Sequence, residues 1–355
     1  MRAMILAAGY GSRLRPLTAV LPKPLVPVAN RPLLWHIIMR LRACGIHEIV
    51  INLHYRGQQI REWLGTGEPL GVAVTYSEEP ELLGSAGGAR RVRDFFGNEP
   101  ALLVHGDLLF DVDLGEVIRY HLSHQAHATL VLHPAHHRFN YGTIKVNAHG
   151  EIAQFVNAQA PWISGPLVET VFTGVQILDP RLLDRIPAER FAVLTTDLYP
   201  SLLTPASRVF GYLMQGYWSD IGTPFRYWQA NMDAVRGRIA PVWAGLPHEP
   251  DPEETQPGRL PATSRLCPPV TLGSALRVGE GCCIGPETVV GEGCEMAEGV
   301  HIVGSVLWPR VRVGTEATIE RSIIMSDVVI PARSHLSGKI VSPSGTEELA
   351  GQGEG

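Results

Sequence analysis

The sequence lacks the excess of basic charge that binding to a nucleic-acid polymer requires. Charged residues make up only 18% of the chain, the formal net charge is −5, and no long run of lysine or arginine occurs. Because such binding depends on neutralising many phosphates, we do not expect a nucleic-acid partner. A small polyanion remains compatible with this composition if a metal ion and a few well-placed cations supply local positive charge.

Long apolar runs and a cysteine pattern are also missing. No stretch approaches the ~18 apolar residues that a membrane-spanning helix needs, and the N-terminal segment becomes glycine-rich too soon for a signal peptide. The five cysteines are odd in number and contain no C-x-x-C pair, which indicates reduced thiols. We therefore expect a cytoplasmic protein that has no membrane partner.

What is present begins with an alternation of short apolar runs and helical patterns over residues 1–236. That order predicts an α/β domain with a Rossmann-like, mixed but mainly parallel sheet flanked by helices. Ligands of such sheets bind beyond the carboxyl ends of the strands, where a glycine-rich turn and Asp107 both fall. We expect strands at 3–7, 48–53, 72–76 and 101–105, and helices that begin at Pro32, span 57–64 and lie near 86–96.

The C-terminal third contains a proline-rich stretch, a repeat and a glycine-rich end. Because proline fixes φ and donates no backbone hydrogen bond, we predict an extended linker over 237–264. From 343 onward the sequence is rich in glycine and glutamate, and we predict a flexible tail over 343–355.

Between them, an aliphatic residue followed by glycine recurs every six residues. The pairs are Leu272-Gly273, Val278-Gly279, Ile284-Gly285 and Val290-Gly291. This period suits a triangular β-solenoid with one hexapeptide per face, and it resembles the short left-handed β-helix of hexapeptide-repeat proteins, which we place at 265–342.

Many such proteins are acyltransferases, and His301 and His335 are the histidines available here for that chemistry. Acetyltransferase versions generally run longer, so an assembly or regulatory role is favoured. Exposed coil ends need covering, which predicts a homo-oligomer.

The residues suited to chemistry concentrate in one segment, L-A-A-G-Y-G-S-R-L-R-P-L-T at 6–18, with P-K-P at 22–24. The two glycines allow backbone N–H groups to approach a phosphate chain closely. Arg13 can direct two donors at terminal phosphates, and Lys23 lies between two prolines that stiffen its backbone.

This segment resembles the signature of the sugar-1-phosphate nucleotidyltransferases, which include mannose-1-phosphate guanylyltransferases and glucose-1-phosphate thymidylyl- and uridylyltransferases. The resemblance continues through L-G-S-A-G at 83–87, H-G-D at 105–107 and W-S-D-I-G-T-P at 218–224. A β-helix tail also occurs in the guanylyltransferase branch.

The resemblance implies that an NTP and a sugar 1-phosphate are the substrates. It implies that Lys23 lies near the α-phosphate, and that Asp107 and Asp220 hold Mg²⁺, which prefers oxygen ligands. A turn aspartate at 107 and a helix N-cap at 220 are the alternatives. The implied catalytic residues are Arg13, Lys23 and Asp107, and the implied nucleotide-binding residues are Leu6, Ala8, Gly9, Gly11, Ser12, Arg13, Glu79, Gly84 and Ser85.

The match is thinner at the sugar phosphate. Relatives carry a Phe-x-Glu-Lys-Pro motif, whereas F-V-N-A-Q stands here at 155–159. Asn157 can still hydrogen-bond a hydroxyl, but Ala158 cannot replace a lysine. The expected sugar-phosphate residues are Lys23, Gly142, Asn157, Thr173 and Arg190, with Lys145 as an alternative cation.

Glu79 bears on the choice of base. Guanine offers two adjacent donors that suit a carboxylate, whereas uracil and thymine offer one N–H flanked by carbonyl oxygens. This favours GTP, although Glu78 or a backbone group is an alternative reader. The histidines at 133, 136 and 137 are interpreted as part of a solvated loop, because no matched fourth metal ligand accompanies them.

We therefore expect GTP and mannose 1-phosphate to give GDP-mannose and pyrophosphate by in-line attack at the α-phosphorus, without a covalent intermediate. UTP or dTTP with glucose 1-phosphate, or another sugar 1-phosphate, is the alternative within this class. A catalytically silent regulatory subunit is the alternative of another class. The presence of Arg13, Lys23, Asp107 and Asp220 argues against it.

Overall fold

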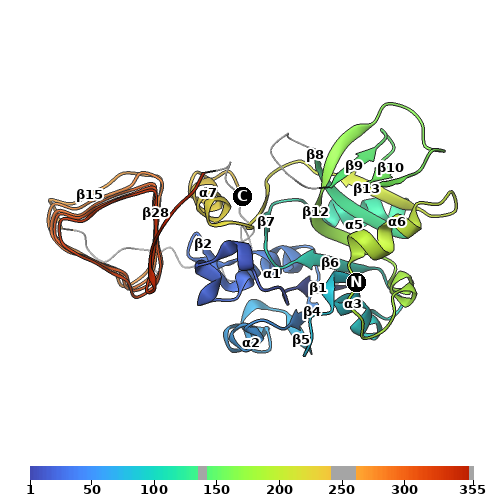
Figure 1. Ribbon diagram of the computed structural model, residues 1–355, viewed down its shortest axis with the longest axis horizontal. Helices are drawn as coiled ribbons and strands as arrows, with labels where there is room; N and C mark the ends of the chain where they lie inside the picture. The colour runs from blue at the N-terminus through green and yellow to red at the C-terminus, as the bar shows by residue number, and fades with distance from the viewer. Residues whose placement is uncertain (135–141, 241–260, 352–355) are drawn as a thin grey trace. The chain divides into compact units, whose positions relative to one another are not determined.

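The computed structural model describes residues 1–134, 142–240 and 261–351. Contacts divide the chain into two compact units (Figure 1). The expected positions His136 and His137, and most of the predicted linker, lie outside the described residues. The first unit comprises Met1–Tyr10, Pro22–Pro24 and Leu34–Asp220, and the second comprises Gly11–Leu21, Leu25–Leu33 and Ile221–Gly355.

The first unit is built on one mixed sheet with the strand order β11-β10-β9-β12-β6-β1-β4-β5. Its parallel half consists of β1 (Arg2–Leu6), β4 (Glu48–Leu53), β5 (Ala73–Glu78) and β6 (Ala101–His105). Ala3, Met4 and Ile5 are fully buried, as expected of a central strand covered on both faces.

The other half of this sheet is antiparallel around the long strand β12 (Val168–Leu178), which pairs with β6, β8 and β9. The mixed α/β sheet is confirmed, and this half contains its antiparallel pairs, because β12 runs against all three of its partners. Its other strands are β8 (Ala128–Pro134), β9 (Thr143–Val146), β10 (Ile152–Phe155), β11 (Ala158–Gln159) and β13 (Val209–Leu213).

Helices accompany this sheet, as Figure 1 shows. The helix expected near 86–96 divides at Val92 into α3 and α4. Asp113 caps α5 by accepting a hydrogen bond from the Glu116 backbone N–H at 3.0 Å, which satisfies one of the free donors of the first turn. The helices are α1 (Leu33–Ala43), α2 (Gly57–Leu64), α3 (Gly84–Arg91), α4 (Arg93–Phe96), α5 (Leu114–Ser123) and α6 (Tyr199–Leu202).

The second unit contains a β-helix, which Figure 1 shows as a triangle of three sheets. Ile284, Ile302 and Ile319 stack in its buried core. The first sheet contains β15 (Arg265–Leu266), β18 (Cys283–Ile284), β21 (His301–Val303), β24 (Thr318–Glu320) and β27 (His335–Ser337). The second contains β16 (Val270–Leu272), β19 (Thr288–Val290), β22 (Val306–Leu307), β25 (Ile323–Ile324), β28 (Lys339–Ser342) and β29 (Gly345–Glu348). The third contains β17 (Arg277–Val278), β20 (Glu295–Met296), β23 (Arg312–Val313) and β26 (Val329–Ile330).

The length of the coils explains why the hexapeptide phase is interrupted. Arg265 pairs with Cys283 and Cys283 with His301, a step of 18 residues. His301 then pairs with Thr318 and Thr318 with His335, a step of 17 residues. One residue is therefore lost from each later coil while the three-sided stacking continues.

The flexible tail predicted from 343 is wrong for Gly345–Glu348, which forms β29 antiparallel to β28. The Lys339 ammonium pairs with the Glu348 carboxylate across this hairpin. The outer edge of β28 is thereby hydrogen-bonded rather than open, and this pairing outweighs the glycine- and glutamate-rich composition.

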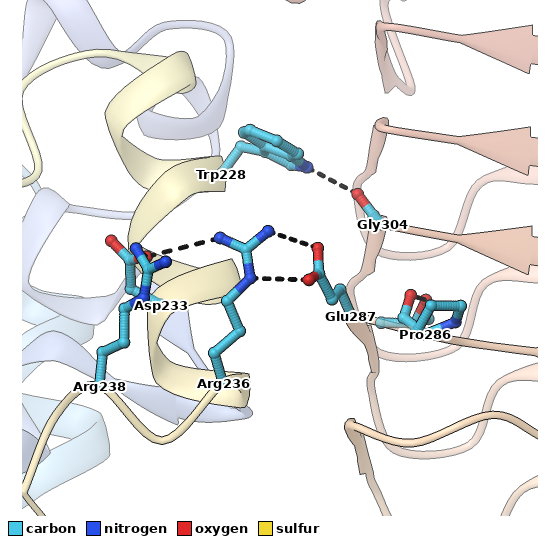
Figure 2. Close-up of polar contacts among 8 residues, drawn as sticks. Trp228, Asp233, Arg236, Arg238, Pro286, Glu287 and Gly304 are labelled. Carbon is cyan, nitrogen blue, oxygen red and sulfur yellow. Dashed lines mark hydrogen bonds and ion pairs between the residues drawn. The ribbon is translucent and has the colours of Figure 1, made fainter.

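Helix α7 (Pro224–Val235) packs on the β-helix within the second unit (Figure 2). Trp228 Nε1 donates to the Gly304 carbonyl at 2.7 Å, and Arg236 Nε donates to Glu287 Oε1 at 2.7 Å. The predicted boundary at 236 coincides with the end of α7. By its contacts, however, α7 belongs to the second unit, which resumes at Ile221.

The short hairpin of β2 (Pro27–Val28) and β3 (Arg31–Pro32) belongs to the same unit. Asn30 Nδ2 donates to the Val290 carbonyl at 2.9 Å, and the Ala29 backbone N–H donates to Asn231 Oδ1 at 3.0 Å.

Among the described residues, no helix has the length and apolar character needed to cross a membrane.

Candidate active site

Two glycine-containing turns leave the first unit's sheet at the same edge. The parallel neighbours β1 and β6 end opposite each other, with Leu6 paired to His105. The Gly106 backbone N–H donates to the Leu6 carbonyl at 2.8 Å, and a Cβ at Gly106 would lie 2.9 Å from that oxygen. Glycine at 106 therefore allows the turn after β1 and the turn carrying Asp107 to approach each other closely.

Asp107 and Lys23 form an ion pair at this edge, with side chains 29% and 12% exposed, respectively. Burial by itself would raise the pKa of the Asp107 carboxyl. The charges of Lys23 and His105, together with hydrogen bonds from Lys23 and the backbone, outweigh it and lower that pKa. Burial lowers the pKa of His105. Asp107 is thus held as a carboxylate beside a cation.

Asp220 reaches the same place through a second ladder. Strand β14 (Trp218–Asp220) pairs antiparallel with β7 (Leu108–Phe110), which places Asp220 opposite Leu108. Asp111 Oδ1 anchors this pair by accepting from the Tyr217 backbone N–H at 2.5 Å. Asp220 therefore lies opposite the residue that follows Asp107, although the two aspartates are 113 positions apart in the sequence.

This donor set fits a magnesium ion that is shared with a substrate. Within the described ranges, no cluster of three or more His, Cys, Asp or Glu side chains could hold a metal by itself. Mg²⁺ is commonly bound by one or two carboxylates together with substrate phosphates. The contact of the Lys23 ammonium with Asp107 shows that this carboxylate accommodates a cation.

Glu79 lies near the same edge but is 2% exposed. Its Oε1 accepts from Asn52 Nδ2 at 2.8 Å, and its Oε2 accepts from the Leu83 backbone N–H at 2.9 Å. Both oxygens are bonded inside the protein, which favours a positioning role over direct pairing with guanine.

The start of α3 is held by the segment around Ala192. The Ala192 carbonyl accepts from the Ala86 N–H at 2.9 Å, and Ser85 Oγ accepts from the Leu194 N–H at 3.0 Å. A Cβ at Gly84, where φ is +73°, would lie 2.5 Å from the Ala192 carbonyl oxygen, so this position requires glycine. Arg190 lies beside the same helix, because a Cβ at Gly87 would lie 2.3 Å from the Arg190 carbonyl oxygen.

Of the expected sugar-phosphate residues, Gly142 and Asn157 are brought close together. The Val156 backbone N–H donates to the Thr143 carbonyl at 2.9 Å, and a Cβ at Gly142 would lie 2.7 Å from Val156 Cγ2. Asn157 is exposed in the turn after Phe155.

Thr173, unlike Asn157, is buried. It is 1% exposed, and its hydroxyl donates to the Val131 carbonyl at 2.8 Å. The alternative cation Lys145 pairs with Glu169 at 2.9 Å. Among these expected residues, Asn157 and Arg190 have the exposed side chains.

The remaining signature residues lie in the second unit. Gly11 adopts φ +62° and ψ +30°, and its carbonyl accepts from the Leu14 N–H at 3.0 Å and from Thr18 Oγ1 at 2.8 Å. Ser12 and Arg13 are exposed. The left-handed conformation at Gly11 is the kind that shapes backbone anion-binding nests.

Asn52 and His54 were missed in the sequence. His54 Nδ1 lies 2.7 Å from the Glu79 carbonyl oxygen, and its Nε2 lies 2.9 Å from the Tyr10 hydroxyl. Asn52 interrupts the otherwise apolar run of β4, and a polar side chain in a buried strand signals a hydrogen-bonded partner.

Residues 2–237 match a family model described as nucleotidyl transferase. The chain belongs to the nucleotidyl transferase family. Residues 266–347 match a second model, the GMPPB C-terminal domain. Together these matches confirm the resemblance seen in the signature segment and in the repeat.

Similar proteins carry related activities in their names. Mannose-1-phosphate guanylyltransferase from Mycobacterium tuberculosis is 30% identical over 320 residues, which cover 90% of this chain and 83% of that protein. Mannose-1-phosphate guanylyltransferase 1 from Arabidopsis thaliana is 29% identical over 332 residues, covering 91% of this chain and 86% of that protein. A solved structure from Bacillus anthracis, assigned as a glucose-1-phosphate thymidylyltransferase, superimposes with a TM-score of 0.57 at 26% identity, covering 65% of this chain and 94% of the other.

Proposed function

We propose that this nucleotidyl transferase converts GTP and mannose 1-phosphate into GDP-mannose and pyrophosphate, with Mg²⁺ as its metal ion. The observation that carries the proposal is the β7–β14 pairing, which places Asp220 opposite Leu108, the residue after Asp107, with Lys23 paired to Asp107. Two carboxylates and one ammonium suit a reaction whose difficulty lies in aligning and neutralising phosphates rather than in covalent chemistry.

The proposed roles follow from the chemistry of each side chain. Mg²⁺, when held by Asp107 and Asp220, would neutralise charge on the nucleotide phosphates. Lys23 would orient the α-phosphate and the attacking sugar phosphate. The backbone N–H groups after β1 and the exposed Arg13 would bind the departing pyrophosphate. Asn157 and Arg190, which are exposed, are the proposed sugar-phosphate contacts.

The preference for GTP rests on the guanylyltransferase relatives, because the Glu79 carboxylate is buried and already bonded on both oxygens. Glucose 1-phosphate with dTTP or UTP is the alternative, and the similarity to the Bacillus anthracis structure supports it. The two pairs share one mechanism and differ only in the groups that recognise the base and the sugar.

The proposal is tested by measuring pyrophosphate release from purified protein with Mg²⁺, each of four NTPs and a panel of sugar 1-phosphates. Fastest turnover with GTP and mannose 1-phosphate supports the assignment. Faster turnover with another pair retains the reaction class and overturns the substrates. Absence of turnover with every pair, in protein shown to be folded, overturns the proposal and favours a silent regulatory subunit.

We also propose a cytoplasmic homo-oligomer. The five cysteines are free thiols, as expected in a reducing compartment. The end strands of a β-helix present unpaired backbone groups, which association between chains can cover. Sedimentation equilibrium of the full chain tests the oligomer, because a single species with the mass of one chain would exclude it.

A further inference from the structure

A buried chain of three hydrogen bonds in the first unit, here called the relay, joins the turn after β1 to the turn before α3. The Ala7 backbone N–H donates to Asn52 Oδ1 at 2.7 Å, and Asn52 Nδ2 donates to Glu79 Oε1 at 2.8 Å. The Leu83 backbone N–H donates to Glu79 Oε2 at 2.9 Å. Asn52 is 3% exposed and Glu79 is 2% exposed, so water cannot readily replace these bonds.

The polarity of the relay is fixed by its two ends. Both ends are backbone N–H donors, so the side chains between them must present an acceptor to each end. One amide and one carboxylate meet this requirement, with the amide oxygen toward Ala7 and both carboxylate oxygens accepting. With a glutamine at 79, two donors would face each other somewhere in the relay, whichever way the two amides were turned.

Gly88 and His54 pack or bond against Asn52 and Glu79. Helix α3 approaches the relay at Gly88, where a Cβ would lie 2.5 Å from Glu79 Oε1 and 3.0 Å from Asn52 Nδ2. His54 adds a second connection: with Nδ1 donating to the Glu79 carbonyl, Nε2 is left to accept from the Tyr10 hydroxyl. The turn after β1 is therefore tied to the Glu79 region through both Asn52 and His54.

We propose that Asn52 and Glu79 are positioning residues that hold the two nucleotide-binding turns, 7–10 and 83–85, at a fixed separation. This inference rests on the proposed function, which assigns both turns to the NTP. Glu79 acts through backbone placement and does not contact the base, because such contact would break its bond to Asn52 or to Leu83. Reading of the base then falls to other groups in these turns.

The test exploits the polarity of the relay. Glu79→Gln places two hydrogen-bond donors opposite each other, and Asn52→Asp places two carboxylate oxygens opposite each other. Each single variant should therefore raise the KM for the NTP roughly tenfold or more. In the double variant N52D/E79Q, the introduced aspartate accepts from Ala7 and from the new amide, whose oxygen accepts from Leu83. The double variant should recover a KM within about threefold of the wild type.

A direct base contact by Glu79 makes a different prediction. In that case Glu79→Gln should change the preference among NTPs, Asn52→Asp should have little effect, and the double variant should behave like Glu79→Gln. That pattern would overturn the proposal. The matched control is Glu48→Gln, which changes an exposed carboxylate at the start of β4, the strand that carries Asn52. Glu48 pairs with Arg2, and its replacement should leave the KM unchanged.

A readout independent of turnover separates this inference from the proposed function. Amide hydrogen exchange at Ala7 and Leu83 should accelerate in both single variants and return to slow exchange in the double variant. That result supports the relay even if no substrate pair is turned over. If amide exchange at Ala7 and Leu83 is as fast in the double variant as in the single variants, the proposed relay is wrong. If a single variant fails to fold, recovery of folded protein in N52D/E79Q is itself the expected rescue.

Discussion

Trp308 Nε1 donates a hydrogen bond of 2.8 Å to the hydroxyl of Tyr227, which in turn donates to the Pro27 carbonyl at 2.7 Å. Trp308 follows β22 of the β-helix, Tyr227 lies on α7, and Pro27 lies on the β2–β3 hairpin. The two aromatic side chains are 2% and 0% exposed. The hexapeptide repeat is therefore packed into one unit with the hairpin, and that unit also contains the Gly11–Leu21 part of the signature segment.

Tyr227→Phe is expected to destabilise the second unit by about 1–3 kcal/mol, because it leaves the buried Trp308 N–H without an acceptor. Urea unfolding followed by tryptophan fluorescence measures this loss. Trp228→Phe removes the half-buried bond to Gly304 and is the control, with a smaller expected loss. Equal losses in the two variants would contradict a special role for the Tyr227 hydroxyl.

Truncation after Ser342 is expected to destabilise the β-helix, because it removes β29 and exposes the edge of β28. Ile340 and Val341 lose their ladder partners Glu347 and Thr346, and an open edge favours association between chains. Each kcal/mol lost should lower the Tm by roughly 2–8 °C. Truncation after Leu349 retains β29 and should behave as the full chain does in thermal unfolding and light scattering.

Apolar runs and amphipathic periods predicted the strands and helices that can be recognised from their own residues alone. The expected ranges 48–53, 57–64 and 101–105 coincide with β4, α2 and β6, because each has an apolar run or an amphipathic period bounded by turn residues. The antiparallel half of the sheet and strand β29 were not predicted. Both depend on which strand lies beside them, and periodicity does not contain that information.

The candidate site shows the same contrast between what local sequence predicts and what depends on long-range contacts. The family signature predicts Lys23, Asp107 and Asp220 as site residues, but the β7–β14 pairing that brings Asp220 opposite Leu108 is long-range and is not visible in the sequence. Glu79 was interpreted as a base reader because its sequence position does not reveal Asn52, 27 residues earlier, or the Leu83 N–H that it accepts from. The role of a carboxylate depends on what already occupies its oxygens.

Acid should weaken the first unit partly through His121, which is 2% exposed and whose Nδ1 lies 2.9 Å from Thr129 Oγ1. Burial lowers its pKa to about 4, with Asp179 opposing this shift and His127 adding to it. Between the ordinary value near 6.5 and about 4, the unfolded chain binds more protons than the folded one. Stability should therefore fall as the pH drops through this window.

His121→Gln removes the titrating group and should reduce the loss between pH 7 and pH 4.5 by about 1–2 kcal/mol. Urea unfolding at the two pH values measures the difference. Because other groups titrate over the same range, the comparison between wild type and variant is decisive. An identical pH dependence in both proteins would show that His121 does not carry this effect.

Asp107→Asn is expected to lower kcat about 100-fold or more, because it removes one of two carboxylates proposed to hold Mg²⁺ and the partner of Lys23. Pyrophosphate release at saturating substrates measures the loss, and higher Mg²⁺ should recover part of it if the carboxylate acts through the metal. Asp113→Asn is the matched control, because it changes an exposed aspartate only six residues away and asparagine still caps α5. If the two variants kept equal activity, Asp107 would have no part in the chemistry, and the edge formed by β6, β7 and β14 would have to be reassigned.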